Sequence, residues 1–225
     1  MENNITPEQY FCRLFSAAKI KTAEQDAKSI TKNSDSFLEI MQKDGYTLEG
    51  GLGCTADAAL MSRLVAALTS RRITDRFSQG FKYSDEAVKE YVVGLLFGFS
   101  HESVAALLFD KRKRFISADF ISDGTVSASE FLPRKLVETV MRGKASFLVL
   151  AHNHPCGMAK ISEADMIATS EIIRTLKDVD VTLLHHYVVS GFEVTDCMDA
   201  LNNKSCRDSE CISAFVLNAS KPKNQ

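Results

Sequence analysis

The hydrophobic pattern of this chain changes once, near residue 98, and that change constrains the fold. Before it, apolar residues recur at the three- and four-residue spacing of amphipathic helices. After it, short apolar runs alternate with helical segments, as in a mixed sheet covered by helices. We therefore predict an all-α region followed by an α/β (α+β) domain. The expected parts are a helical module over residues 1–80, an α/β domain over 85–200 and a polar tail over 201–225, with a linker within 73–84.

Periodicity, cap residues and turn residues give the expected elements. Thr6 before Pro7 and Ser84 before two acidic residues are favourable helix starts. The expected helices span residues 7–18, 23–32, 34–43, 56–72, 85–97, 133–141 and 162–177. The expected strands span residues 104–109, 115–121, 146–151, 181–190 and 192–195. The basic run Lys111–Arg114 then falls at a hairpin turn, where it is either merely solvated or contacts phosphates or an acidic peptide.

Composition limits the classes of function. With 225 residues and 45% hydrophobic content, the chain can bury a sizeable core. A net charge of −2 gives no overall attraction to nucleic acid, and no apolar run is long enough to cross a bilayer. The start lacks a secretory signal, so we expect a cytoplasmic protein with no membrane partner. Six scattered cysteines suit reduced thiols, with metal binding by Cys206 and Cys211 as a minor alternative.

One short stretch points to metal chemistry. His152 and His154 are two residues apart at the end of a predicted buried strand, so both imidazoles lie on one side of it. Asp165 falls in the first turn of the next predicted helix. Two neutral imidazoles and a carboxylate form a typical catalytic zinc site whose fourth position is left to water. We therefore predict that His152, His154 and Asp165 bind one Zn²⁺ per chain.

Two other interpretations apply to the same residues. Ser162 and Asp165 have the spacing of a capping box, which would fix the helix start and is compatible with metal binding. The two histidines alone could be a hydrogen-bonded surface pair. The conjunction favours the metal site, because both histidines, a proline and the Ser–Asp pair occur together while three of the five histidines lie elsewhere.

The order of these residues resembles a known metal motif. His152-x-His154-Pro155 followed by Ser162-x-x-Asp165 resembles that of the JAB/MPN (JAMM) metallopeptidase superfamily. The longer string from His152 to Gly157 resembles its bacterial RadC-like branch, historically labelled a DNA repair family. Other segments that fit the branch are Phe109-Asp110, Gly124-Thr125-Val126, Pro133-Arg134 and His186-Tyr187-Val188-Val189. The resemblance is strong over residues 85–195 and weak before them, where Gly51-Leu52-Gly53 resembles a helix-hairpin-helix turn.

The resemblance implies a JAB/MPN-type catalytic domain with a mixed sheet flanked by helices, preceded by a helix-hairpin-helix-like module. It also implies a zinc-dependent metallopeptidase or isopeptidase that acts on a peptide or protein substrate. In that superfamily a glutamate upstream of the histidines is the general base, and Glu102 occupies this place. Ser162 would stabilise the oxyanion. Glu130 and Glu138 are the other candidate bases, and Glu102 could instead be an ordinary exposed residue.

The remaining residues of interest mostly favour structural roles. His185 and His186 alternate on an apolar strand, so one is expected to point inward and form hydrogen bonds, while His101 is expected at the surface. Cys156 stands where the RadC-like pattern usually has serine, and it could bind zinc or be redox-sensitive.

The glycine turn of the helical module bears on DNA binding. It is followed by Ala56 and Asp57 where the family tends to have a lysine, so duplex DNA binding is expected to be weak, with partial compensation from Arg63, Arg71 and Arg72. The alternative function is a non-catalytic DNA-associated or protein-binding scaffold.

Overall fold

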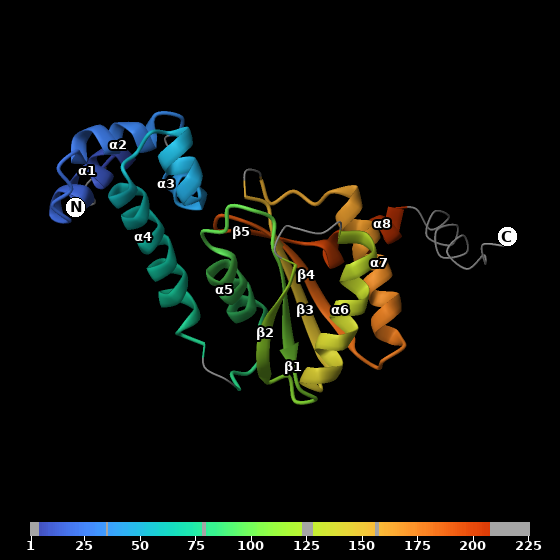
Figure 1. The fold of residues 1–225 in the computed structure, drawn as a ribbon. Coiled ribbons are helices and arrows are strands. Elements are labelled where there is room, and N and C mark those ends of the chain that lie inside the picture. The colour runs from blue at the N-terminus through green and yellow to red at the C-terminus, as the bar shows by residue number, and fades with distance from the viewer. Residues whose placement is uncertain (1–4, 35, 78–79, 123–127, 156–157, 208–225) are drawn as a thin grey trace.

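The computed structural model describes residues 5–34, 36–77, 80–122, 128–155 and 158–207. A helical part lies beside an α/β part, and the two meet along helices α4 and α5 (Figure 1). No helix within these residues is long and apolar enough to span a membrane.

The helical part consists of four α-helices and one π-helical turn. They are α1 (Pro7–Ala17), α2 (Ala23–Thr31), α3 (Phe37–Gln42), η1 (Thr47–Gly51) and α4 (Ala56–Thr74). Thr6 is the N-cap residue of α1, as expected, and it also forms a capping box with Gln9. The core contains Phe11, Phe15, Ile30 and Leu48, all fully buried.

A buried carboxylate joins α2 to the start of α4. Asp26 accepts hydrogen bonds from the Thr55 backbone N–H at 2.8 Å and from the hydroxyls of Thr55 and Thr22, each at 2.7 Å. Thr55 is the N-cap residue of α4. Burial raises the pKa of Asp26, but these hydrogen bonds outweigh that effect and leave it below its usual value. Asp26 therefore fixes the position of Thr55, which connects the glycine turn at residues 51–53 to the start of α4.

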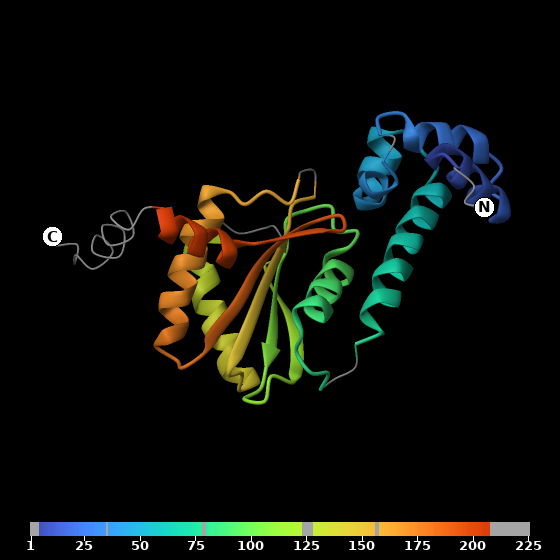
Figure 2. The ribbon, with the colours of Figure 1, turned by 180° about the vertical axis from the view of Figure 1, so that it is seen from behind.

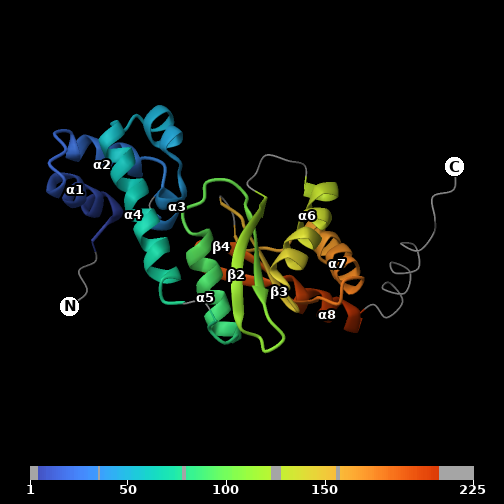
Figure 3. The same ribbon diagram turned by 60° about the horizontal axis from the view of Figure 1, so that its bottom comes forward.

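Close backbone contacts join α4 to α5 (Asp85–Leu96). The Ser70 hydroxyl donates to Gly94 O at 2.7 Å, and a Cβ built on Gly94 would lie 2.5 Å from Ile73 Cγ2. Arg63 donates to Gly98 O at 2.7 Å. The two helices lie side by side in Figure 3. Only glycine at position 94 permits this approach.

Five strands form one mixed sheet in the order β2-β1-β3-β4-β5. They are β1 (Val104–Phe109), β2 (Phe115–Ser122), β3 (Phe147–Asn153), β4 (Thr182–Ser190) and β5 (Glu193–Asp196). Strands β3 and β4 are parallel, and the other neighbours are antiparallel. Helix α5 covers one face, while α6 (Ala128–Gly143) and α7 (Glu163–Lys177) cover the other (Figure 2). The predicted fold class, a mixed sheet flanked by helices after a helical module, is confirmed.

Two expected boundaries are wrong. Helix α6 begins at Ala128 and contains Pro133, which was expected to open it. A proline this close to a helix start removes one intrahelical hydrogen bond, and the helix continues to Gly143. The expected loose tail overlaps a further helix, α8 (Cys197–Arg207). Helix α8 packs against β4 and α7 through its first turn, where Cys197 is buried and Met198 contacts the core, so tertiary contacts stabilise a helix whose later residues are mostly polar. The segment Gly124–Val126 and the tail beyond Arg207 lie outside the described residues.

Candidate metal centre

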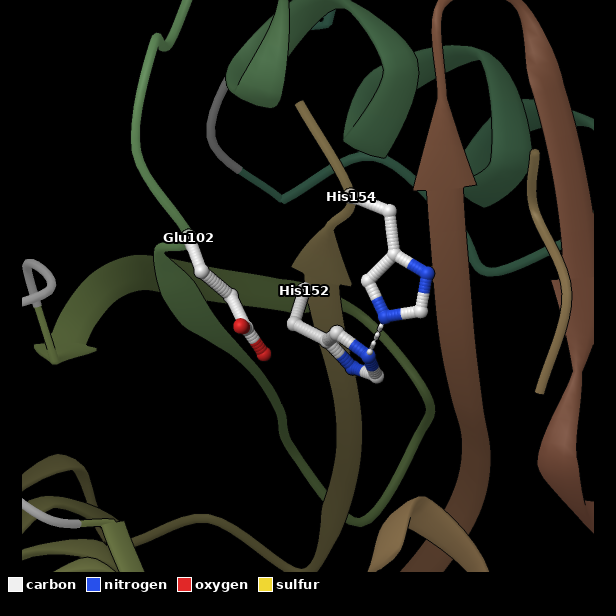
Figure 4. A group of neighbouring side chains, drawn as sticks. All are labelled: Glu102, His152 and His154. Atoms are coloured by element: carbon white, nitrogen blue, oxygen red, sulfur yellow. Dashed lines mark hydrogen bonds between the residues drawn. The ribbon is translucent and has the colours of Figure 1, made fainter. Parts of the chain in front are cut away.

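The ends of β1 and β3 bring the predicted site residues together. Val104, the first residue of β1, pairs with His152 near the end of β3. Glu102 precedes β1 by two residues and therefore lies beside the two histidines (Figure 4). Residues His152 and Asn153 are buried, His154 is partly buried and Glu102 is exposed. The site thus opens to solvent on the side of Glu102.

The candidate ligand atoms converge on one point. One ligand atom each from Glu102, His152 and His154 lie within 4.8 Å of one another. The Nε2 atoms of His152 and His154 are 3.2 Å apart. Asp165 Oδ1 lies 3.2 Å from His152 Nε2, and its Oδ2 lies 4.0 Å from His154 Nε2. Ligand atoms around a tetrahedral zinc are about 3.3 Å apart, given bonds of about 2.0 Å. The donor set fits zinc in chemistry, and the separations of His152 from His154 and from Asp165 match this spacing, while the 4.0 Å between Asp165 and His154 is longer.

The capping box expected at the start of α7 is present and holds Asp165. Asp165 Oδ2 accepts from Ser162 N and from the Ser162 hydroxyl, each at 2.7 Å, and Asp165 N donates to Ser162 Oγ at 3.1 Å. Burial raises the pKa of Asp165, but its other contacts, among them the two hydrogen bonds from Ser162, outweigh burial and hold that pKa well below its usual range. The carboxylate is therefore ionised at neutral pH, so the cap and the predicted ligand role are compatible.

Asn153, which the sequence analysis did not assign a role, holds the loop that carries Glu102. Its Oδ1 accepts from Ser103 N at 2.8 Å, and its Nδ2 donates to His101 O at 3.0 Å. These two contacts flank Glu102 on either side. The sequence does place Asn153 between the two histidines, so its side chain is expected on the opposite face of the strand, and this position could have indicated a supporting role.

His186 lies directly behind His152. Its Nε2 is 3.0 Å from His152 Nδ1, and its Nδ1 is 2.6 Å from the Thr169 hydroxyl on α7. Burial, with His152 nearby, lowers the pKa of His186 to about 3. The expectation that one of the paired histidines points inward and forms hydrogen bonds is confirmed. Thr169 carried no distinguishing sequence signal.

His185 faces the other side of the sheet. Its Nδ1 is 2.5 Å from Asp196 Oδ2, and its Nε2 is 3.6 Å from Asp85 Oδ1. The contact with Asp196 links β4 to the end of β5, and the contact with Asp85 links it to the start of α5. His185 therefore has a structural role distant from the metal centre.

The other candidate residues do not join the centre. Glu138 is exposed and pairs with Arg134 at 3.1 Å, as expected for a solvated helix face. His101 is exposed, also as expected. The side chain of Glu130 and all of Cys156 lie outside the described residues, so the roles considered for them stay predictions.

Charged residues of α4 bear on the expected DNA binding. Asp57 is exposed in the first turn of α4, where a negative charge repels phosphate. Arg63 donates to Lys43 O and Gly98 O, and Arg71 pairs with Asp75 at 2.7 Å. Two of the three arginines expected to compensate are therefore engaged within the chain.

Comparison with known proteins matches the α/β part to one family. Residues 82–200 match the family described as the RadC-like JAB domain. A UPF0758 protein from Janthinobacterium sp. (strain Marseille) is 34% identical over 152 residues, which is 67% of each chain. A UPF0758 protein from Cupriavidus necator is 30% identical over 188 residues, which is 80% of this chain and 81% of the relative.

Proposed function

Because the chain belongs to the RadC-like JAB domain family, we propose that it is a zinc-dependent metallopeptidase or isopeptidase. The observation that carries this proposal is the convergence of Glu102, His152 and His154, with Asp165 at 3.2 Å from His152. Zinc in such a site lowers the pKa of a bound water and polarises the scissile carbonyl. The substrate is proposed to be a peptide or protein.

The two carboxylates are proposed to have different roles. Asp165 is only 13% exposed and is held by two hydrogen bonds from Ser162, so its position suits a ligand. Glu102 is exposed on the open side of the site, so it can approach a substrate and exchange a proton. His152, His154 and Asp165 would hold the metal, while Glu102 would take the proton of the attacking water and pass it to the leaving amine.

The hydrogen bond from Ser162 to Asp165 limits how far the Ser162 hydroxyl can stabilise an oxyanion. A serine hydroxyl carries a single proton, and here that proton goes to Asp165. Stabilising an oxyanion requires the hydroxyl to turn toward the substrate, which leaves Asp165 with the backbone hydrogen bond from Ser162 N. We propose that Ser162 contributes chiefly by orienting Asp165 and secondarily by contacting the oxyanion.

Glu102→Gln tests the assignment of the base. The amide keeps the shape but cannot accept the proton, so zinc content should match the wild type while cleavage falls about 10²-fold or more. A peptide and isopeptide library would first supply a substrate. Glu138→Gln is the matched control, because Glu138 is exposed and pairs with Arg134. Wild-type cleavage by Glu102→Gln would exclude Glu102 as the base, and loss of zinc would make it a ligand.

The alternative function is a scaffold that binds DNA or protein without catalysis. The described geometry disfavours it, because the donor groups are all present, converge and are held by neighbouring side chains. DNA is proposed as a weak partner at most, given the exposed Asp57 at the start of α4.

A further inference from the structure

A chain of hydrogen bonds runs from the backbone of α7 to the metal centre. Thr169 Oγ1 lies 2.5 Å from Asp165 O and 2.6 Å from His186 Nδ1. His186 Nε2 lies 3.0 Å from His152 Nδ1. Thr169, His186 and His152 are all buried, so these neighbours, rather than bulk water, determine where their protons lie.

The donor and acceptor of each hydrogen bond in this series follow from the bond between Thr169 and the Asp165 carbonyl. A backbone carbonyl can only accept, so the single hydroxyl proton of Thr169 goes to Asp165 O. The Thr169 oxygen then accepts from His186 Nδ1–H. A neutral imidazole has one N–H, so a neutral His186 that donates from Nδ1 has only Nε2 left to accept, and its partner there is His152 Nδ1–H. This leaves His152 Nε2 unprotonated, with its lone pair directed at the metal centre.

We propose that Thr169 and His186 are positioning residues that hold His152 in the Nδ1–H tautomer and thereby prepare it to bind the metal. The opposite tautomer would place an N–H on Nε2, which is 3.2 Å from Asp165 Oδ1. That proton would form a hydrogen bond with the carboxylate and would have to leave before a metal could bind. The tautomer assignment stands on the hydrogen bonds and a neutral His186, whereas its effect on metal affinity rests on the proposed function.

Long-range ¹H–¹⁵N correlation spectra of the metal-free protein test the tautomer directly. At neutral pH we expect Nδ1–H signatures for both His152 and His186. Thr169→Val removes the acceptor for His186 Nδ1–H and should shift both rings toward the Nε2–H form. A wild-type His152 in the Nε2–H form would overturn the proposal.

Zinc affinity, measured by competition with a chromophoric chelator, tests the consequence. Thr169→Val should weaken zinc binding about 10- to 100-fold, the usual effect of losing a group that orients a ligand. Thr169→Ser should restore it, because the hydroxyl returns. Thr175→Val is the matched control, since the Thr175 hydroxyl donates to Glu171 O at 2.9 Å six residues further along the same helix.

The outcomes separate this proposal from the proposed function. Unchanged zinc affinity in Thr169→Val would overturn the positioning role. If the wild type binds no zinc, the proposed function fails, and the tautomer spectra of wild type and Thr169→Val then decide the relay by themselves.

A second, independent feature is an exposed apolar stripe on α4. Leu60, Leu64 and Leu68 are spaced by four residues and are 69%, 48% and 59% exposed. The opposite side of the helix buries Ala58, Ala59, Ser62 and Ala66. Three large apolar side chains in one exposed row form the kind of patch that is often found where another protein binds.

The sequence of the stripe is symmetric about Leu64. Leu60 and Leu68 are each four residues from it, and the exposed Asp57 and Arg71 are each seven residues from it. A two-fold interface brings the same patch of two copies together, so antiparallel α4 helices crossing at Leu64 would pair Leu60 with Leu68. They would also bring Asp57 to Arg71, which would share its guanidinium between Asp57 of the other copy and Asp75 of its own chain. Parallel helices would instead bring like charges together.

We infer that a second copy of this chain packs on the stripe in the antiparallel orientation. One helix face is small compared with the roughly 1,000 Å² that a stable interface buries, so the dimer should be weak and depend on concentration. Sedimentation velocity over a range of concentrations should show association in the wild type, and Leu64→Glu should abolish it. Met158→Glu, at a 73% exposed apolar residue elsewhere, is the control.

Charge reversal tests the orientation. Asp57→Arg and Arg71→Asp should each weaken association, and the double variant should restore it, because the swapped pair has the same attraction. A wild type that stays monomeric up to several hundred micromolar would overturn the dimer. A double variant no better than either single variant would overturn the antiparallel orientation.

Discussion

Asn153→Ala should destabilise the protein through the loop that carries Glu102. The change removes the acceptor for the buried Ser103 N–H and the donor for His101 O. A buried unpaired group costs about 1–3 kcal/mol, while the carbonyl of the more exposed His101 can be partly rehydrated. We therefore expect the free energy of unfolding to fall by about 2–4 kcal/mol. Urea unfolding followed by far-UV circular dichroism measures this, with the denaturant slope unchanged.

Two further variants sharpen this test. Asn153→Asp keeps an acceptor for Ser103 N–H but presents a second acceptor to His101 O, so it should also destabilise. Asn202→Ala is the control, because Asn202 is exposed on α8. A loss below about 0.5 kcal/mol for Asn153→Ala, the usual range of surface substitutions, would refute the reasoning.

Three other perturbations have defined outcomes. Asp26→Asn should lower the free energy of unfolding at neutral pH. Because the folded pKa of Asp26 is depressed, its contribution to stability is present above the unfolded pKa of about 3.9 and is lost as pH falls through the folded pKa. The free energies of unfolding of wild type and variant should therefore converge at low pH. Ser162→Ala should cost about 1 kcal/mol in urea unfolding through the lost cap, and a neutral result would contradict the capping box. Duplex DNA should bind weakly at physiological salt in an anisotropy titration; a tight, salt-sensitive complex would favour the scaffold alternative.

The sequence was sufficient where the signal is local. The helix caps at Thr6, Ser84 and Ser162 follow from a few adjacent residues, and each is present. The two histidines at the end of β3 likewise follow from the alternation of side chains along a strand. Local hydrogen bonding and periodicity decide such features, so they require no knowledge of the rest of the fold.

Long-range contacts explain what the sequence did not predict. The bond between Asn153 and Ser103 joins residues 50 positions apart, and Thr169 meets His186 only when α7 packs on β4. Strand alternation predicted that one of the paired histidines points inward but not which one. The register of β4 against β3 shifts between Leu148 and Val149, and such a bulge changes the face to which the following side chains point.

Metal content measured on the purified full chain tests the central proposal most directly. After exposure to zinc and removal of excess metal, the wild type should retain about one zinc per chain, as expected for a three-ligand site. His154→Ala should retain far less, because two remaining ligands hold zinc poorly, while His101→Ala, which alters an exposed histidine nearby, should retain as much as the wild type. Equal zinc in the wild type and His154→Ala, or none in either, would contradict the proposal.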